Sequence, residues 1–279
     1  MTVLLSPPLE NAEIDCVEVL IDADTLLYRV GFLWFPSQEE YEKACVDSFR
    51  KTILKCESMA KKFYPHIDAI RVRLFFTRKG PKYRSLFDKE CKYKEHRKKA
   101  AKPRFVEEMM RAISLHLPYE RISLDSTEGE ADDCLSIAAN YLRSIYVPYL
   151  IAGCDKDLRQ IPGNHYNYLT DSHMHITHEM AYRFFFTQLL MGDVADNVPG
   201  IKGVGIKRAG YILHGAISAE DMWDYTVSAY MTAYDKTMSE EEISELLYER
   251  ANKLYLLKYR GDQWYPPIPE FDPKMYHGY

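Results

Sequence analysis

Residues 17–24 have the sequence VEVLIDAD, an apolar and β-branched stretch that ends in two acidic residues. Such a run predicts a buried β-strand over residues 17–21, because strands are enriched in Val and Ile. Asp22 and Asp24 then lie where this strand leaves its sheet. A strand that carries two carboxylates to its end predicts a polar site there, and later parts of the sequence repeat the arrangement.

Strands and helices are predicted to alternate through the first two thirds of the chain. Further strands are predicted at residues 70–76, 121–124, 147–152 and 165–169. Helices are predicted at residues 37–63, 104–116 and 131–145, the first of them after a capping box of Ser37 and Glu40. This alternation is typical of βαβ units, so we expect an α/β domain with three layers and a mostly parallel sheet.

The last third of the chain is predicted to be helical. Helices are expected at residues 182–191, 206–214 and, after a capping box of Ser239 and Glu242, up to about residue 257. The tail is rich in Pro and aromatic residues, which predicts an irregular segment. We therefore expect an α/β domain over residues 1–180 with a basic insertion at about 78–105, a helical region over 181–257 and a tail over 258–279.

Four clusters of acidic residues follow predicted strands or lie in the helical region. Their acidic members are Asp22, Asp24, Glu130, Asp132, Asp133, Asp155, Asp157, Asp193 and Asp196. The carboxyl ends of parallel strands meet at one edge of a sheet, so three of the clusters are expected to converge. Like charges about 5 Å apart repel by ~3 kcal/mol at an effective dielectric of ~20, so these carboxylates need cations. Ligand sets made only of oxygen favour Mg²⁺ or Mn²⁺.

Each acidic cluster has a simpler interpretation when it is considered alone. Asp132 and Asp133 fall in the first turn of a helix, where acids are favoured by the helix dipole. Asp155 and Asp157 are compatible with a plain turn. The convergence of the clusters favours a two-metal site, in which ions about 3.5–4 Å apart activate water and stabilise the leaving oxygen of a phosphoryl group.

A strongly basic segment stands out from an acidic chain. Residues 78–104 contain twelve Lys and Arg residues and three acidic residues, whereas the whole chain has a net charge of −5. This asymmetry predicts a segment that grips a polyanion such as nucleic acid. A solvated loop is the competing interpretation.

A Gly-rich loop between two predicted helices offers a second contact for a nucleic-acid backbone. Gly200, Gly203 and Gly205 allow a phosphate to approach backbone N–H groups. The cations beside these glycines are Lys202, Lys207 and Arg208. Contacts of this kind do not depend on base sequence, and an ordinary helical hairpin is the alternative.

The composition favours a cytoplasmic protein. The chain has 279 residues, of which 47% are hydrophobic, and no apolar run approaches the roughly 18–20 residues of a membrane helix. Residues 1–11 contain no Lys or Arg and do not resemble a signal peptide. The six cysteines lack CxxC spacing, which predicts reduced thiols. His173, His175 and His178 are interpreted as exposed hairpin histidines, and the tail aromatics as packing on their own domain or docking to an unknown partner.

Several motifs together resemble the structure-specific 5′-nucleases. These motifs are EADD at 130–133, CDKD at 154–157, YKEHR at 93–97 and MGDVADNVPGIKGVGIKRA at 191–209. The family includes flap endonucleases, the 5′-nuclease domain of bacterial DNA polymerase I and stand-alone phage 5′→3′ exonucleases. The resemblance extends from about residue 17 to residue 213, and the length is most similar to that of the phage enzymes.

This resemblance implies a PIN-like fold with a basic helical arch and a helix–hairpin–helix element that binds duplex DNA. It implies that Asp22 is the metal ligand of the first strand. It also implies that Glu130, Asp132 and Asp133 serve one metal cluster and that Asp155, Asp157, Asp193 and Asp196 serve the second. It further implies catalytic roles for Lys94 and Arg97 and DNA contacts by Arg84 and Tyr93. The loop from Gly200 to Gly205 resembles a hairpin that also binds K⁺ in the family.

One position departs from the family pattern. The family commonly has Asp directly after the second strand, where this sequence has Thr77 or Arg78. Asp24 is the candidate substitute. The resemblance implies a Mg²⁺-dependent 5′→3′ exonuclease or flap endonuclease, in the host cytoplasm if a phage encodes it. Its substrates would be DNA 5′ ends, 5′ flaps or RNA–DNA primers. The alternatives are a weakly catalytic or non-catalytic DNA-binding member of the fold and a PIN-type ribonuclease.

Overall fold

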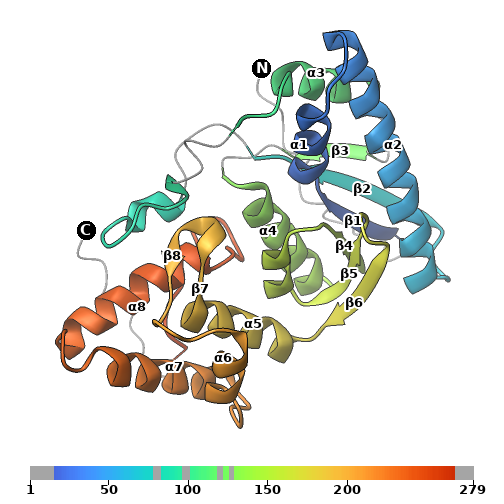
Figure 1. Cartoon of the computed structure of the whole chain (residues 1–279). Coiled ribbons are helices and arrows are strands. Elements are labelled where there is room, and N and C mark those ends of the chain that lie inside the picture. Colours follow the sequence, from blue (N-terminus) through green and yellow to red (C-terminus); the bar gives the residue numbers. More distant parts are fainter. Residues whose placement is uncertain (1–15, 78–82, 96–100, 118–121, 126–128, 268–279) are drawn as a thin grey trace.

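β1 (Cys16–Asp22) is buried along its whole length in the computed structural model, as its apolar sequence predicts. The structure describes residues 16–77, 83–95, 101–117, 122–125 and 129–267. β1 lies near the middle of a six-stranded sheet with the order β3-β2-β1-β4-β5-β6 (Figure 1). The other strands are β2 (Ala69–Phe75), β3 (Ile122–Asp125), β4 (Tyr149–Ala152), β5 (Gly163–Asn167) and β6 (Ser172–Ile176). Every neighbouring pair is parallel except β5 with β6, which confirms the mostly parallel sheet.

Alternate side chains of β1 pack against helices on the two faces of the sheet. Val19 and Ile21 belong to a hydrophobic cluster with α1 (Asp24–Phe32), α2 (Gln38–Phe63) and α3 (Val106–His116). Leu20 belongs to another cluster with α4 (Ala131–Ser144). Full burial of each large apolar side chain stabilises the folded state by about 1.5–3 kcal/mol, so the helices on both faces stabilise the positions of the strand ends.

The remaining helices share a hydrophobic cluster of their own. Its elements are α5 (His178–Met191), α6 (Ile206–Ile212), α7 (Ala219–Tyr234) and α8 (Glu240–Leu254). Between α5 and α6 lie the short strands β7 (Gly192–Asp193) and β8 (Val198–Pro199). Trp264 from the tail packs into this cluster, as expected, whereas Phe271 and Tyr276 lie outside the described residues.

Two helices were not predicted from the sequence. α1 begins at Asp24, directly after β1, so the second acid of the opening motif is the first residue of a helix. α7 follows a capping box of Ser218 and Asp221, a local signal that the sequence analysis did not use. α8 follows the predicted capping box of Ser239 and Glu242 but ends at Leu254.

The structure agrees with two expectations drawn from composition. All six cysteines are free thiols. No helix in the described ranges has the length and the apolar character that a bilayer crossing requires.

Candidate metal centre

The site begins where β1 ends. Asp22 is its last residue and is buried, and its carboxylate accepts hydrogen bonds from the Asp24 amide at 3.2 Å and the Thr25 hydroxyl at 3.4 Å. Burial, and then the charges of Asp24 and Asp155, raises the pKa of Asp22 to about 7. Asp155 follows β4, the parallel neighbour of β1, so the clusters after these two strands lie close enough to interact electrostatically.

Three further carboxylates lie at the start of α4. One oxygen atom from each of Glu130, Asp132 and Asp133 lies within 4.8 Å of the other two. Burial raises the pKa of Asp132 well above its usual value, and the neighbouring charges of Asp133 and Glu130 add to this against the opposing charge of Arg84. Carboxylates this close together favour either protons or cations between them.

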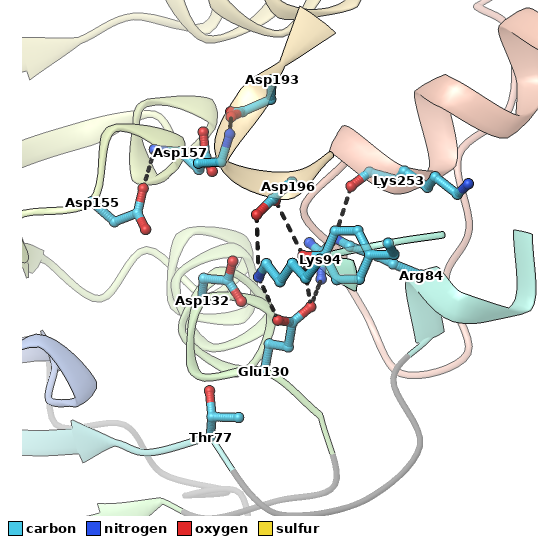
Figure 2. Close-up of polar contacts among 12 residues, drawn as sticks. Thr77, Arg84, Lys94, Glu130, Asp132, Asp155, Asp157, Asp193, Asp196 and Lys253 are labelled. Atoms are coloured by element: carbon cyan, nitrogen blue, oxygen red, sulfur yellow. Dashed lines mark hydrogen bonds and ion pairs between the residues drawn. The ribbon is translucent and has the colours of Figure 1, made fainter. Parts of the chain in front are cut away.

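Lys94 and Tyr93 connect this group to Asp196. The Nζ atom of Lys94 lies 2.6 Å from Glu130 Oε1 and 3.5 Å from Asp196 Oδ1 (Figure 2). The Tyr93 hydroxyl lies 3.0 Å from a Glu130 oxygen and 3.2 Å from an Asp196 oxygen. Burial disfavours the charge of Lys94, but Glu130 and Asp196 outweigh it and raise the pKa of Lys94. The predicted catalytic lysine is therefore in contact with the acidic residues.

The remaining acids lie beyond β4 and in β7 and the turn after it. Asp155 accepts a hydrogen bond at 2.9 Å from the Asp157 amide and so begins the short helix η3 (Lys156–Gln160). Asp193 accepts one at 2.8 Å from the Ala195 amide. Burial, and then the charges of Asp155, Asp193 and Asp196, raises the pKa of Asp157 to about 7. All four acidic clusters therefore gather at the carboxyl edge of the sheet.

Thr77, one of the two residues expected where the 5′-nucleases commonly have Asp, lies two residues after β2. Its amide donates to Asp24 Oδ1 at 3.1 Å, and its hydroxyl accepts from the Ala131 amide at 2.9 Å. Thr77 thus fastens the end of β2 to the starts of α1 and α4 without adding a charge. Asp24 remains a candidate substitute ligand, and Arg78 lies outside the described residues.

Arg84 and Tyr93, from which DNA contacts were expected, are both buried in the structure. Arg84 is 2% exposed, and its guanidinium donates to Glu130 at 2.8 Å and to Asp133 at 2.6 and 2.9 Å. It also donates to the carbonyl oxygens of Lys253 and Tyr255. Tyr93 is 8% exposed. These side chains are buried among acidic residues 37 to 103 positions further along the chain, and the DNA contacts expected of them stay predictions.

The predicted glycine loop lies on the surface. Lys202, Lys207 and Arg208 are exposed, and Gly203 has a φ angle of 80°, which favours glycine. Gly200 lies so close to Gly192 that a Cβ atom on Gly200 would approach the Gly192 nitrogen to 2.3 Å. Arg97 lies outside the described residues.

The three histidines of the β6 region show no metal site. His173, His175 and His178 are exposed, as predicted. Among the described residues, the side chains whose ligand atoms lie close enough together to share one metal ion are those of Glu130, Asp132 and Asp133. A transition-metal site at these histidines therefore has no support.

The sequence analysis missed two polar side chains that contact the acids. Lys156 pairs with Asp193, although it stands within the CDKD motif. Gln188 donates to Asp157 and Asp193 from within the apolar sequence of α5. A single buried amide in an apolar helix segment is a signal that points to a polar partner.

The donor set fits divalent cations. Nine carboxylates gather in the four clusters, and the described cations paired with them are Arg84, Lys94 and Lys156. The raised pKa values of Asp22 and Asp157 indicate that positive charge beside these two carboxylates would be bound favourably. Oxygen ligands suit Mg²⁺ or Mn²⁺ better than softer metals.

Comparison with known proteins points to one family. No family model matches the chain. A curated 5′-3′ exonuclease of Buchnera aphidicola subsp. Schizaphis graminum is 28% identical over 207 residues, which cover 70% of this chain and 69% of that protein. The chain is thus similar in sequence to this 5′-3′ exonuclease over more than two thirds of both proteins. This relative confirms the resemblance to 5′-nucleases that the motifs indicated.

Two solved structures share the fold of this chain. The bacteriophage T5 D15 protein, co-crystallised with metal ions, has a TM-score of 0.58 and 18% identity, over 87% of this chain and 89% of that chain. A variant of the T5 D15 flap endonuclease in a pseudo-enzyme–product complex with DNA and metal ions has a TM-score of 0.57 and 18% identity, over 86% and 90% of the two chains. At this identity the likeness establishes the shared α/β fold.

The raised pKa of Asp22 predicts a pH-dependent stability. An unfolded Asp titrates near 3.9, so between pH ~4 and ~7 the folded state holds more protons and the free energy of unfolding falls as pH rises. His165 acts in the opposite sense, because burial lowers its pKa to about 4 and protonation at low pH favours unfolding. Asp22→Asn isolates the first effect. In the presence of a chelator, we compare the free energy of unfolding of the variant with that of the parent. The difference, variant minus parent, should increase by on the order of 2 kcal/mol from pH 5 to pH 8.

Urea unfolding of both proteins at the two pH values measures this difference. A difference between variant and parent that is the same at pH 5 and pH 8 would contradict the prediction. Addition of Mg²⁺ at pH 8 should stabilise the parent more than the variant, because the ion replaces the proton as the neutralising charge.

Proposed function

We propose that this chain is a metal-dependent 5′-nuclease that hydrolyses DNA phosphodiesters and leaves 5′-phosphates. It would act as a 5′→3′ exonuclease, as a flap endonuclease, or as both. The observation that carries the proposal is the gathering of four acidic clusters, distant in sequence, at the carboxyl edge of a parallel sheet. The name of the exonuclease relative and the fold of the T5 flap endonuclease support it.

The carboxylates divide into two groups that could each hold an ion. The residues that would hold the metals are Asp22, Asp24, Glu130, Asp132 and Asp133 for one and Asp155, Asp157, Asp193 and Asp196 for the other. When bound, Mg²⁺ or Mn²⁺ supplies Lewis-acid stabilisation of the charge that develops on the phosphate oxygens. Thr25 and Thr77 hold Asp22 and Asp24, so these two ligands are oriented before any ion binds.

Lys94 is the residue that we expect to bind the scissile phosphate. Its side chain is 19% exposed and its Nζ atom lies against Glu130 and Asp196, so the ammonium group can reach a phosphate held by either acidic group. Its backbone is fixed as well, because its amide donates to the Asp196 carbonyl at 3.0 Å. Arg97 would assist from the same basic segment.

Lys94→Ala should slow single-turnover cleavage by more than about tenfold. A cation placed where charge develops in the transition state typically contributes a few kcal/mol. The rate is measured with enzyme in excess over a 5′-flap substrate at saturating Mg²⁺. Lys92→Ala is the matched control, because Lys92 lies on the same segment with a side chain that is 68% exposed. An unchanged rate for Lys94→Ala would remove this lysine from the mechanism.

The exposed glycine loop is the proposed contact for duplex DNA. Lys202, Lys207 and Arg208 would bind phosphates of the duplex and Gly200 to Gly205 would admit the backbone, in a helix–hairpin–helix formed by α5 and α6. A K⁺ ion held by backbone carbonyls belongs to the same proposal. We further propose the division into an α/β domain over 1–180 with an arch at about 78–105, a helical region over 181–257 and a tail over 258–279.

A Mg²⁺ titration with an end-labelled 5′-flap substrate tests the function. We expect cleavage that requires divalent ions, stops with chelator and leaves 5′-phosphorylated products. Flap, nicked, blunt and RNA–DNA primer substrates then define the preferred 5′ end. DNA binding without cleavage at any Mg²⁺ or Mn²⁺ concentration would favour a non-catalytic member of the fold. The supporting feature of that alternative is Thr77 or Arg78 at the position where the family commonly has Asp.

A further inference from the structure

A buried amide joins two of the acidic clusters. Gln188 lies in α5 and is 3% exposed. Its Nε2 atom donates to Asp157 Oδ1 at 2.6 Å and to Asp193 Oδ2 at 3.2 Å. A side-chain amide nitrogen carries two hydrogen atoms, so both of its donors are used by carboxylates from two different segments.

A second amide sets the orientation of the first. Gln160 Nε2 donates to Gln188 Oε1 at 3.1 Å and to the Leu254 carbonyl at 2.7 Å. Gln160 Oε1 accepts from the Leu256 amide at 3.2 Å. A backbone carbonyl can only accept and a backbone N–H can only donate, so the amide of Gln160 has one orientation. The amide of Gln188 must then direct its NH₂ group at the carboxylates.

Gln188 differs from the charged partner of Asp193. Lys156 also contacts Asp193, but its side chain is 47% exposed and contributes a full positive charge. Gln188 is enclosed and neutral, so it restricts the rotation of Asp157 and Asp193 without cancelling the negative charge that attracts a cation. Groups that orient metal ligands in this way typically affect metal affinity or activity about 10- to 100-fold.

We propose that Gln188 is a positioning residue that holds Asp157 and Asp193 in the arrangement that binds one divalent cation. Gln160, anchored on the backbone at the end of α8, fixes the direction of this amide. The proposal deepens the proposed function and rests on it, since it assigns a metal ion to these two carboxylates.

Mn²⁺ binding to the full chain without DNA tests this role. By isothermal titration calorimetry, Gln188→Met should raise the dissociation constant of one Mn²⁺ by about 10- to 100-fold, because Met fills a similar volume and donates no hydrogen bond. In single-turnover assays the Mg²⁺ concentration for half-maximal cleavage should rise, while DNA affinity stays the same. Gln38→Met, on the exposed start of α2, is the control and should bind Mn²⁺ like the parent.

Gln160→Glu gives a second and independent measurement. It keeps an acceptor for the Leu256 amide but removes the donors to Leu254 and Gln188, so Gln188 loses its fixed direction. Weakened Mn²⁺ binding in this variant, which alters no carboxylate ligand, would support the proposal even if Gln188→Met failed to fold. Parent-like Mn²⁺ binding in a folded Gln188→Met, or in Gln160→Glu, would overturn it. A parent chain that binds no Mn²⁺ would overturn the proposed function itself.

Discussion

Asp155→Asn is expected to abolish metal-dependent cleavage, with a loss of about 10³-fold or more, while DNA binding persists. Asp155 is exposed, and Asn can keep the hydrogen bond from the Asp157 amide that begins η3, so the fold should be retained. The substitution removes one negative charge from the group that contains Asp157 and Asp193. A loss of about 4 kcal/mol in transition-state stabilisation corresponds to this factor, and bound metal ions contribute that much.

Single-turnover assays with a 5′-flap substrate measure the loss of cleavage, and gel-shift assays with the same substrate measure whether DNA binding persists. Asp224→Asn, on the exposed face of α7, removes the same charge far along the chain and serves as the control. Full activity of Asp155→Asn in Mg²⁺ would contradict the metal site. A variant that neither cuts nor binds DNA would place Asp155 in substrate binding instead.

Local patterns in the sequence were sufficient to predict five of the six strands of the sheet, all except β6. β1 and β4 are apolar runs, and the capping box of Ser239 and Glu242 predicted the start of α8, because these signals depend on residues close in sequence. α1 was missed because its first residue, Asp24, was interpreted together with Asp22 as the polar end of the first strand. α7 was missed although Ser218 and Asp221 form the same kind of capping box.

The acidic cluster could be predicted, but its internal pairings could not. The parallel topology brings strand ends together, so acids after β1 and β4 had to converge. Nothing near Arg84 in the sequence indicates that it pairs with Glu130 and Asp133, which lie more than 40 residues away. The resemblance to the 5′-nucleases instead implied a DNA contact for Arg84. Long-range burial decides between these roles, and a single sequence does not encode it in any local pattern.

α8 contributes to the site by holding the segment that carries Lys94. Glu249 accepts hydrogen bonds from the backbone amides of Lys89 and Glu90 at 3.1 and 3.0 Å. Lys253 is buried, pairs with Glu249 and lies 3.3 Å from Asp88. The end of α8 thus fixes the backbone four to five residues before Lys94, which explains how a strongly basic segment presents one lysine to the acids.

Arg84→Met is expected to lower the free energy of unfolding by about 3–5 kcal/mol in the absence of divalent ions. Removal of one partner from a buried ion pair leaves an uncompensated charge, which typically costs this amount. Here Glu130 and Asp133 both lose their guanidinium partner, and the carbonyl oxygens of Lys253 and Tyr255 lose a donor. Urea unfolding followed by circular dichroism, in chelator, measures the change.

Divalent ions distinguish the two causes of this loss of stability, which are the missing positive charge and the missing hydrogen-bond donors. If Glu130 and Asp133 bind metal, Mg²⁺ should stabilise Arg84→Met more than the parent, because the ion replaces part of the missing positive charge. The carbonyl oxygens gain nothing from the ion, so the recovery should be partial. Arg84→Lys, which keeps the charge but not the four-way hydrogen bonding, should lie between variant and parent. A loss below about 1 kcal/mol in Arg84→Met, the level of an exposed ion pair, would contradict the buried network and return Arg84 to the surface role that its basic neighbours suggest.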